Sequence, residues 1–162
     1  MLEATMALPV SGFVGCSLAA ALNDARTLRI PNKLCAAILA LFGVYAVIAL
    51  TPAAAAIALA LAGATLIVAF IGYSRGVMGG GDAKLLAACM AWAGPLHAVE
   101  FLIVTGLAGG VIALALRSPY TVMAATRLRR NWPITAARDS AMPYGVAIAA
   151  GALAVVFEIF SA

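Results

Sequence analysis

Six apolar segments dominate this chain of 162 residues. They cover residues 6–22, 34–50, 53–71, 85–98, 101–116 and 142–160. An α-helix rises about 1.5 Å per residue, so crossing a hydrocarbon core about 30 Å thick takes about 20 residues. Most of the segments reach this length once a few flanking residues are added. We therefore predict an all-α fold, a polytopic integral membrane bundle of about six transmembrane helices in a single domain over residues 1–162.

The composition excludes the main alternatives to a membrane protein. Hydrophobic residues make up 65% of the chain and charged residues 10%, whereas soluble domains average about 45–50% and about 25%. Disorder is excluded as well, because it requires low hydrophobicity and high charge. The cysteines Cys16, Cys35 and Cys89 each stand alone in an apolar segment, without metal-site or redox-motif spacing. We interpret them as free thiols and expect no metal site and no cofactor.

The positions of the basic residues predict the orientation of the bundle. All ten lysines and arginines lie in three connections, residues 23–33, 72–84 and 117–141. Cytoplasmic connections carry an excess of these residues, so we predict that these three face the cytoplasm and that both termini face away from it. The formal net charge of +4 then reflects topology, and we expect no nucleic-acid partner. Residues 117–141 fit either an interfacial helix on anionic headgroups or a solvated basic loop.

Two of the six acidic residues lie where a carboxylate needs an explanation. Asp24 comes just after the first apolar segment, and Asp82 follows the glycine run 79–81. The predicted topology places both at the cytoplasmic face, where a bundle can bring them together. Two carboxylates a few ångströms apart share a proton, so one can activate water while its protonated partner polarises a peptide carbonyl. Each also has a simpler interpretation: Asp82 as a helix N-cap, and Asp24 as a surface charge paired with Arg26.

The other acidic residues and the single histidine have simpler interpretations. Glu3, Glu100 and Glu158 lie at helix ends away from the predicted cytoplasmic face, where we expect them to be solvated at the interface. His97 lies near Glu100 and is expected to be solvated too. Asp139 is interpreted as a surface charge or as part of the N-cap region of the last helix.

Short motifs around both aspartates point to a known family. Residues 79–82 read as G-x-G-D, and with Lys84 the motif extends to G-x-G-D-x-K-L. Upstream, Asp24 is followed by Ile-Pro-Asn at residues 30–32, and downstream Met-Pro-Tyr-Gly-Val-Ala at residues 142–147 opens the last segment. G-x-G-D alone is a weak signal, but this combination over most of the chain resembles the type IV prepilin peptidases, intramembrane aspartyl proteases of the G-x-G-D class. The short length and the Pro-Tyr-Gly-Val-Ala ending are most similar to the CpaA/TadV-like branch, which serves tight-adherence (Flp) pili.

The resemblance implies a hydrolase that removes the basic leader of a prepilin at the cytoplasmic face of the bacterial inner membrane. It places the catalytic roles on Asp24 and Asp82, and the expected partners are a prepilin and the lipid bilayer. The candidate substrate-binding residues are Gly79, Gly81, Lys84, Pro143, Tyr144 and Gly145. Larger relatives carry an N-terminal methyltransferase region with a four-cysteine zinc site. This sequence offers no counterpart to it, so we expect a membrane peptidase domain alone.

Two other functions are consistent with the same residues. A non-enzymatic membrane transport or pilus-assembly subunit can use Asp24 and Asp82 to bind a cation or a proton. The glycine run and the lack of ionisable residues deeper in the segments favour the protease. A G-x-G-D protease with another substrate, such as signal-peptide remnants or a preflagellin, has the same motifs. Lys84 biases the ionisation of Asp82, binds a carboxylate of the substrate, or simply extends to the interface. Pro143 either positions substrate or starts the last helix.

Overall fold

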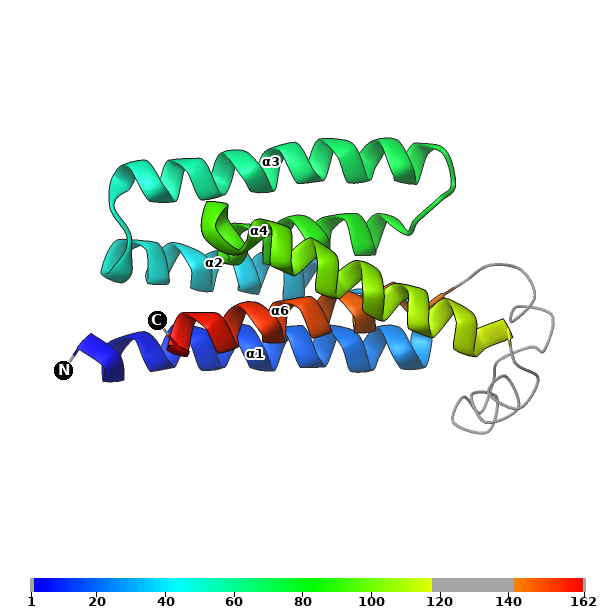
Figure 1. Ribbon diagram of the computed structural model, residues 1–162, viewed down its shortest axis with the longest axis horizontal. Coiled ribbons are helices and arrows are strands. Elements are labelled where there is room, and N and C mark those ends of the chain that lie inside the picture. The colour runs from blue at the N-terminus through cyan, green and yellow to red at the C-terminus, as the bar shows by residue number, and fades with distance from the viewer. Residues whose placement is uncertain (1, 118–141, 162) are drawn as a thin grey trace.

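The computed structural model describes residues 2–117 and 142–161, and in these ranges every regular element is an α-helix (Figure 1). The helices are α1 (Leu2–Thr27), α2 (Asn32–Ala49), α3 (Pro52–Ser74), α4 (Gly80–Arg117) and α6 (Tyr144–Ser161). The all-α prediction is confirmed. Residues 118–141, which include Asp139 and most of the last basic connection, lie outside the described residues, so the proposed interfacial helix stays a prediction.

The helices have the length and the outer surface of a membrane protein. Four are long and apolar enough to cross a membrane: residues Thr5–Thr27 of α1, and all of α2, α3 and α4. A shorter apolar stretch, Tyr144–Ile159, lies in α6. Large apolar side chains such as Val47 and Leu107 are exposed on the outer faces, and extensive exposed apolar surface marks contact with a membrane. The count of six separate spans is not confirmed, because the fourth and fifth predicted segments both lie in α4.

Helix α4 contains a turn at Gly94. A straight helix of its 38 residues would be about 57 Å long, nearly twice the hydrocarbon core. Gly94 instead has φ 55° and ψ −166°, a conformation that glycine adopts without a steric penalty, and Pro95 removes the next backbone donor. Figure 1 shows α4 turning back, so that its early and late parts run in roughly opposite directions. Gly94 and Pro95, which lie within the fourth apolar segment, thus produce a change of direction.

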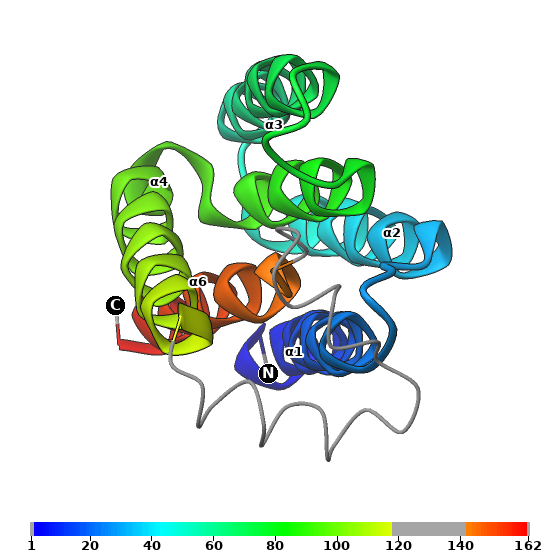
Figure 2. The ribbon, with the colours of Figure 1, turned by 90° about the vertical axis from the view of Figure 1, so that its right-hand side faces the viewer.

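The described lysines and arginines all lie at one end of the bundle. This end holds the α1–α2 and α3–α4 connections and the last turn of α4 (Figures 1 and 2). We call it the basic end, defined by Arg26, Arg29, Lys33, Arg75, Lys84 and Arg117. The opposite end holds the α2–α3 connection, the turn of α4 and the last turn of α6 (Figure 1). The basic residues are therefore gathered on one side of the fold in the described part of the chain.

The core forms around Trp92 in the early part of α4. Its ring stacks on Phe13 of α1 at a centroid distance of 4.3 Å and on Tyr45 of α2 at 5.1 Å. Its indole Nε1 donates a hydrogen bond to the carbonyl oxygen of Ile38 at 3.0 Å, which satisfies a polar group that would otherwise be buried without a partner. Helix α6 packs between α1 and the late part of α4, while α3 lies outermost, against α4 (Figure 2). This packing fixes the helix ends that carry the two aspartates.

Candidate active site

A cavity of about 890 Å³ lies at the basic end, and both Asp24 and Asp82 line it. The two aspartates come from the end of α1 and the first turn of α4. Their carboxylates are near enough to interact electrostatically. Apolar side chains of α3 and of late α4, including Val68 and Leu102, form another part of the wall. The cavity therefore joins a pair of carboxylates to an apolar surface.

Asp24 is held by the first turn of α6. Its side chain is only 3% exposed, and its Oδ2 accepts a hydrogen bond from the backbone N–H of Gly145 at 2.7 Å. The N-terminus of a helix favours a negative charge beside it, because its free N–H groups and its dipole point toward that charge. A Cβ at position 145 would lie 2.9 Å from Oδ2 of Asp24, so only glycine allows this approach. The interpretation of Asp24 as a surface charge is wrong.

Asp82 is held by its own helix start. Its Oδ2 accepts a hydrogen bond from the backbone N–H of Gly79 at 3.2 Å, and the carbonyl of Gly79 accepts the N–H of Ala83 at 3.1 Å. Asp82 thus caps α4 from within the first turn, in the manner of the third residue of a capping box, and is not itself the N-cap. A Cβ at position 79 would lie 2.7 Å from Oδ2 of Asp82. Capping and cavity lining therefore occur together, and the half-buried carboxylate still reaches the cavity.

Ile30 packs between the start of α4, which carries Asp82, and the start of α6, which binds Asp24. A Cβ at Gly81 would lie 3.1 Å from Cβ of Ile30, and a Cβ at Gly145 would lie 3.1 Å from its Cδ1. Ile30 therefore sits between the start of α4 and the start of α6. The amide of Asn23 donates a hydrogen bond to the carbonyl of Arg29 at 2.6 Å, which fixes the connection that carries Ile30. Nothing in the Ile-Pro-Asn motif at residues 30–32 indicated this packing role of Ile30.

Lys84 connects the G-x-G-D-x-K-L motif to the Ile-Pro-Asn motif. Its Nζ donates a hydrogen bond to Oδ1 of Asn32 at 3.0 Å, which ties the first turn of α4 to the first residue of α2. Lys84 is exposed and does not line the cavity. This contact tests none of the roles weighed for Lys84, which stay predictions.

Of the remaining candidates, Gly79 and Tyr144 line the cavity, whereas Gly81 and Pro143 do not. Gly81 packs against Ile30, as described above. The ring of Tyr144 also covers Gly109 of late α4, where a Cβ would lie 2.9 Å from Cε2 of Tyr144. Pro143 stands just before α6 and accepts the N–H of Val146 at 3.3 Å, as a helix-start residue does.

The fold and the cavity define a helical membrane protein with paired carboxylates at the basic end. The sequence model of the type IV leader peptidase family matches residues 12–114, which include Asp24, the G-x-G-D motif and late α4. The match covers well over half of the chain, so the chain belongs to this family and is a membrane protease of the prepilin leader peptidase type. Neither the curated proteins nor the solved structures contain a significant match.

Proposed function

We propose that this chain is an aspartyl endopeptidase that removes the leader peptide of a prepilin at the cytoplasmic face of the bacterial inner membrane. We further propose that its prepilin belongs to a tight-adherence (Flp) pilus system, as in the CpaA/TadV-like branch. The observation that carries the proposal is that Asp24 and Asp82, from separate helices, line one cavity and interact electrostatically. Family membership supports the class of reaction, and the two aspartates supply a mechanism for it.

The proposed reaction uses both carboxylates and one water molecule. One aspartate, ionised, takes a proton from water as the water oxygen attacks the carbonyl carbon of the scissile peptide. The other, protonated, donates a hydrogen bond to the carbonyl oxygen and so stabilises the charge that develops there. When the C–N bond breaks, a proton passes from the aspartate pair to the leaving nitrogen. The pair shares the proton, so neither role is assigned to one residue.

The cavity suits a substrate with a polar part and an apolar part. A prepilin has a basic leader followed by a hydrophobic helix, and the cut falls between them. We propose that the scissile peptide lies at Asp24 and Asp82, with the start of the hydrophobic helix against Val68 and Leu102. Gly79 lines the cavity without a side chain, so a substrate strand can approach the backbone there at the start of α4.

Cleavage by the purified chain is the direct test of this function. The protein in liposomes is expected to cut a synthetic prepilin in buffer containing EDTA, because an aspartate pair activates water without a metal ion. The appearance of the leader peptide is followed by mass spectrometry. Failure to cut in any buffer would favour the non-enzymatic membrane subunit. Cleavage that disappears with EDTA and returns with Mg²⁺ would indicate a metal ion bound by the two aspartates.

The orientation is tested by labelling single cysteines at the two ends of the bundle. In a cysteine-free background, Val77→Cys places a thiol in the α3–α4 connection at the basic end, where Val77 is 79% exposed. Thr51→Cys, in the α2–α3 connection, is the matched control for the opposite end. In inverted membrane vesicles, a membrane-impermeant thiol reagent should label position 77 and not position 51, because the basic end faces the cytoplasm. The reverse pattern would refute the proposed orientation.

A further inference from the structure

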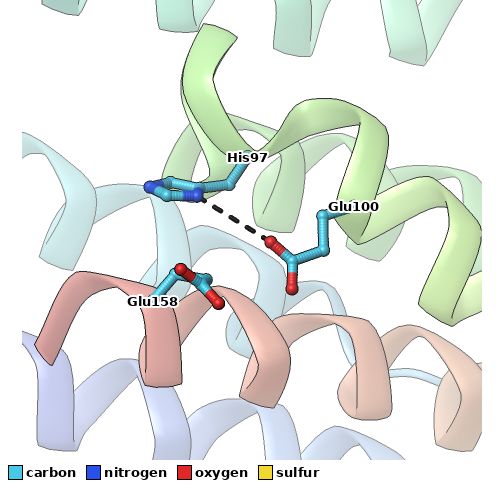
Figure 3. Close-up of side chains that lie close together, drawn as sticks. All are labelled: His97, Glu100 and Glu158. Carbon is cyan, nitrogen blue, oxygen red and sulfur yellow. Dashed lines mark ion pairs between the residues drawn. The ribbon is translucent and has the colours of Figure 1, made fainter. Parts of the chain in front are cut away.

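Three ionisable side chains meet at the opposite end of the molecule from the aspartate cavity (Figure 3). His97 and Glu100 lie one turn apart in α4, just after its turn at Gly94, and Glu158 lies near the end of α6. Nδ1 of His97 is 4.0 Å from Oε2 of Glu100. One ligand atom from each of the three residues lies within 4.8 Å of the others. The sequence predicts three separately solvated groups, whereas the fold brings the three side chains close together.

The cluster combines two carboxylates, Glu100 and Glu158, with one imidazole, His97. Among the residues that the structure describes, every lysine and arginine lies at the basic end. His97 is the one histidine in the chain, and its Nδ1 lies on the side of Glu100. A divalent cation bound between the three side chains would complement the charge of the two carboxylates.

The donor set favours a cation of a particular kind. One imidazole nitrogen and two carboxylate oxygens are ligands of Zn²⁺, which binds them at about 2.0–2.2 Å and keeps a fourth position for water when three protein ligands are present. Mg²⁺ and Ca²⁺ prefer oxygen donors alone. Ligand atoms around a tetrahedral zinc lie about 3.4 Å apart at those bond lengths. The three ligand atoms lie within 4.8 Å of one another, so binding requires these half-buried side chains to rotate and bring the atoms closer.

The two helices that meet here also suit a structural site. His97 and Glu100 are three residues apart on one helix and so share a face, while the third ligand comes from a second helix. Figure 3 shows all three side chains directed into the space between late α4 and α6. The start of α6 donates the hydrogen bond from Gly145 to Asp24. A cation bound at the other end of α6 would hold that end of the helix against α4.

We propose that His97, Glu100 and Glu158 form a structural binding site for a divalent cation of the Zn²⁺ type. The cation joins the turn of α4 to the end of α6 and takes no part in peptide hydrolysis. The site lies on the non-cytoplasmic side of the membrane in the proposed orientation, so its ion comes from the solution on that side.

Direct binding of Zn²⁺ tests this site. Tag-free protein in detergent is titrated with Zn²⁺ against a fluorescent zinc indicator, and its thermal unfolding is followed with and without the ion. We expect one saturable site per chain and a higher unfolding midpoint when Zn²⁺ is bound, because a ligand of the folded state stabilises it. His97→Gln and Glu158→Gln should each weaken binding by at least about tenfold, the loss that follows even from removing an outer partner of a metal ligand.

The control separates this site from the aspartate cavity. A double variant, Asp24→Asn with Asp82→Asn, should bind Zn²⁺ as the wild type does, since it leaves the three proposed ligands intact. All variants keep the three cysteines, so any thiol contribution is common to them. The proposal is overturned if the wild type shows no saturable binding or if His97→Gln and Glu158→Gln bind as the wild type does. Loss of binding in the aspartate variant alone would place the ion in the cavity instead.

Discussion

Asp24→Asn and Asp82→Asn are each expected to abolish leader removal while leaving the protein folded in the membrane. One remaining carboxylate cannot supply both the base and the acid, and loss of one such group lowers a rate by about 10²–10⁴-fold. The asparagine side chain has nearly the same shape as aspartate, and its carbonyl oxygen still accepts the N–H of Gly145 or of Gly79. The measurement is the gel shift of a co-expressed prepilin, with the amount of membrane-inserted protein measured in parallel.

A third aspartate provides the matched control for this experiment. Asp139→Asn removes the same charge from the connection between α4 and α6 and is expected to process prepilin at close to the wild-type rate. Normal processing by either the Asp24 or the Asp82 variant would refute the catalytic assignment. Equal loss in all three variants would point to a general effect of charge, and the aspartate pair would then have no special role.

Gly145→Ala is expected to inactivate the enzyme although it adds a single methyl group. The new Cβ would lie 2.9 Å from Oδ2 of Asp24 and 3.1 Å from Cδ1 of Ile30. Ile30 already packs against Gly81, and the Asp24 carboxylate is held by its hydrogen bond to Gly145. Either that carboxylate or the start of α6 must therefore move, and the hydrogen bond between them is lost. Such overpacking costs about 1–3 kcal/mol of stability, and the displaced carboxylate no longer faces Asp82 in the same geometry.

Gly63→Ala is the matched control for the added methyl group. Gly63 lies in α3, and a Cβ there meets nothing within 4 Å, so this variant should insert, fold and cleave as the wild type does. Prepilin cleavage and the thermal unfolding midpoint are measured for both variants. If Gly145→Ala cleaved as fast as Gly63→Ala, close contact between α6 and Asp24 would not be needed for activity.

The helices themselves could be predicted from the sequence because the signal for them is local. A run of apolar residues about as long as the bilayer is thick must satisfy its own backbone hydrogen bonds, and a helix does so within the run. The G-x-G-D, Ile-Pro-Asn and Pro-Tyr-Gly motifs are local as well, and they carried the family resemblance that the match over residues 12–114 supports. The turn of α4 could not be predicted in the same way, because Gly94 permits a change of direction without specifying one.

The contacts between helices could not be predicted in this way. The sequence by itself determined the class of protein, the apolar helices and the two aspartates of interest. Only the tertiary structure decided that Gly145 donates to Asp24, that Ile30 separates two helix starts, and that His97 and Glu100 face Glu158. These contacts join residues that are distant in the chain, and their distances depend on how side chains of different helices interdigitate. No local pattern of hydrophobicity or spacing encodes that packing, so the partners of each aspartate emerge only once the helices are assembled.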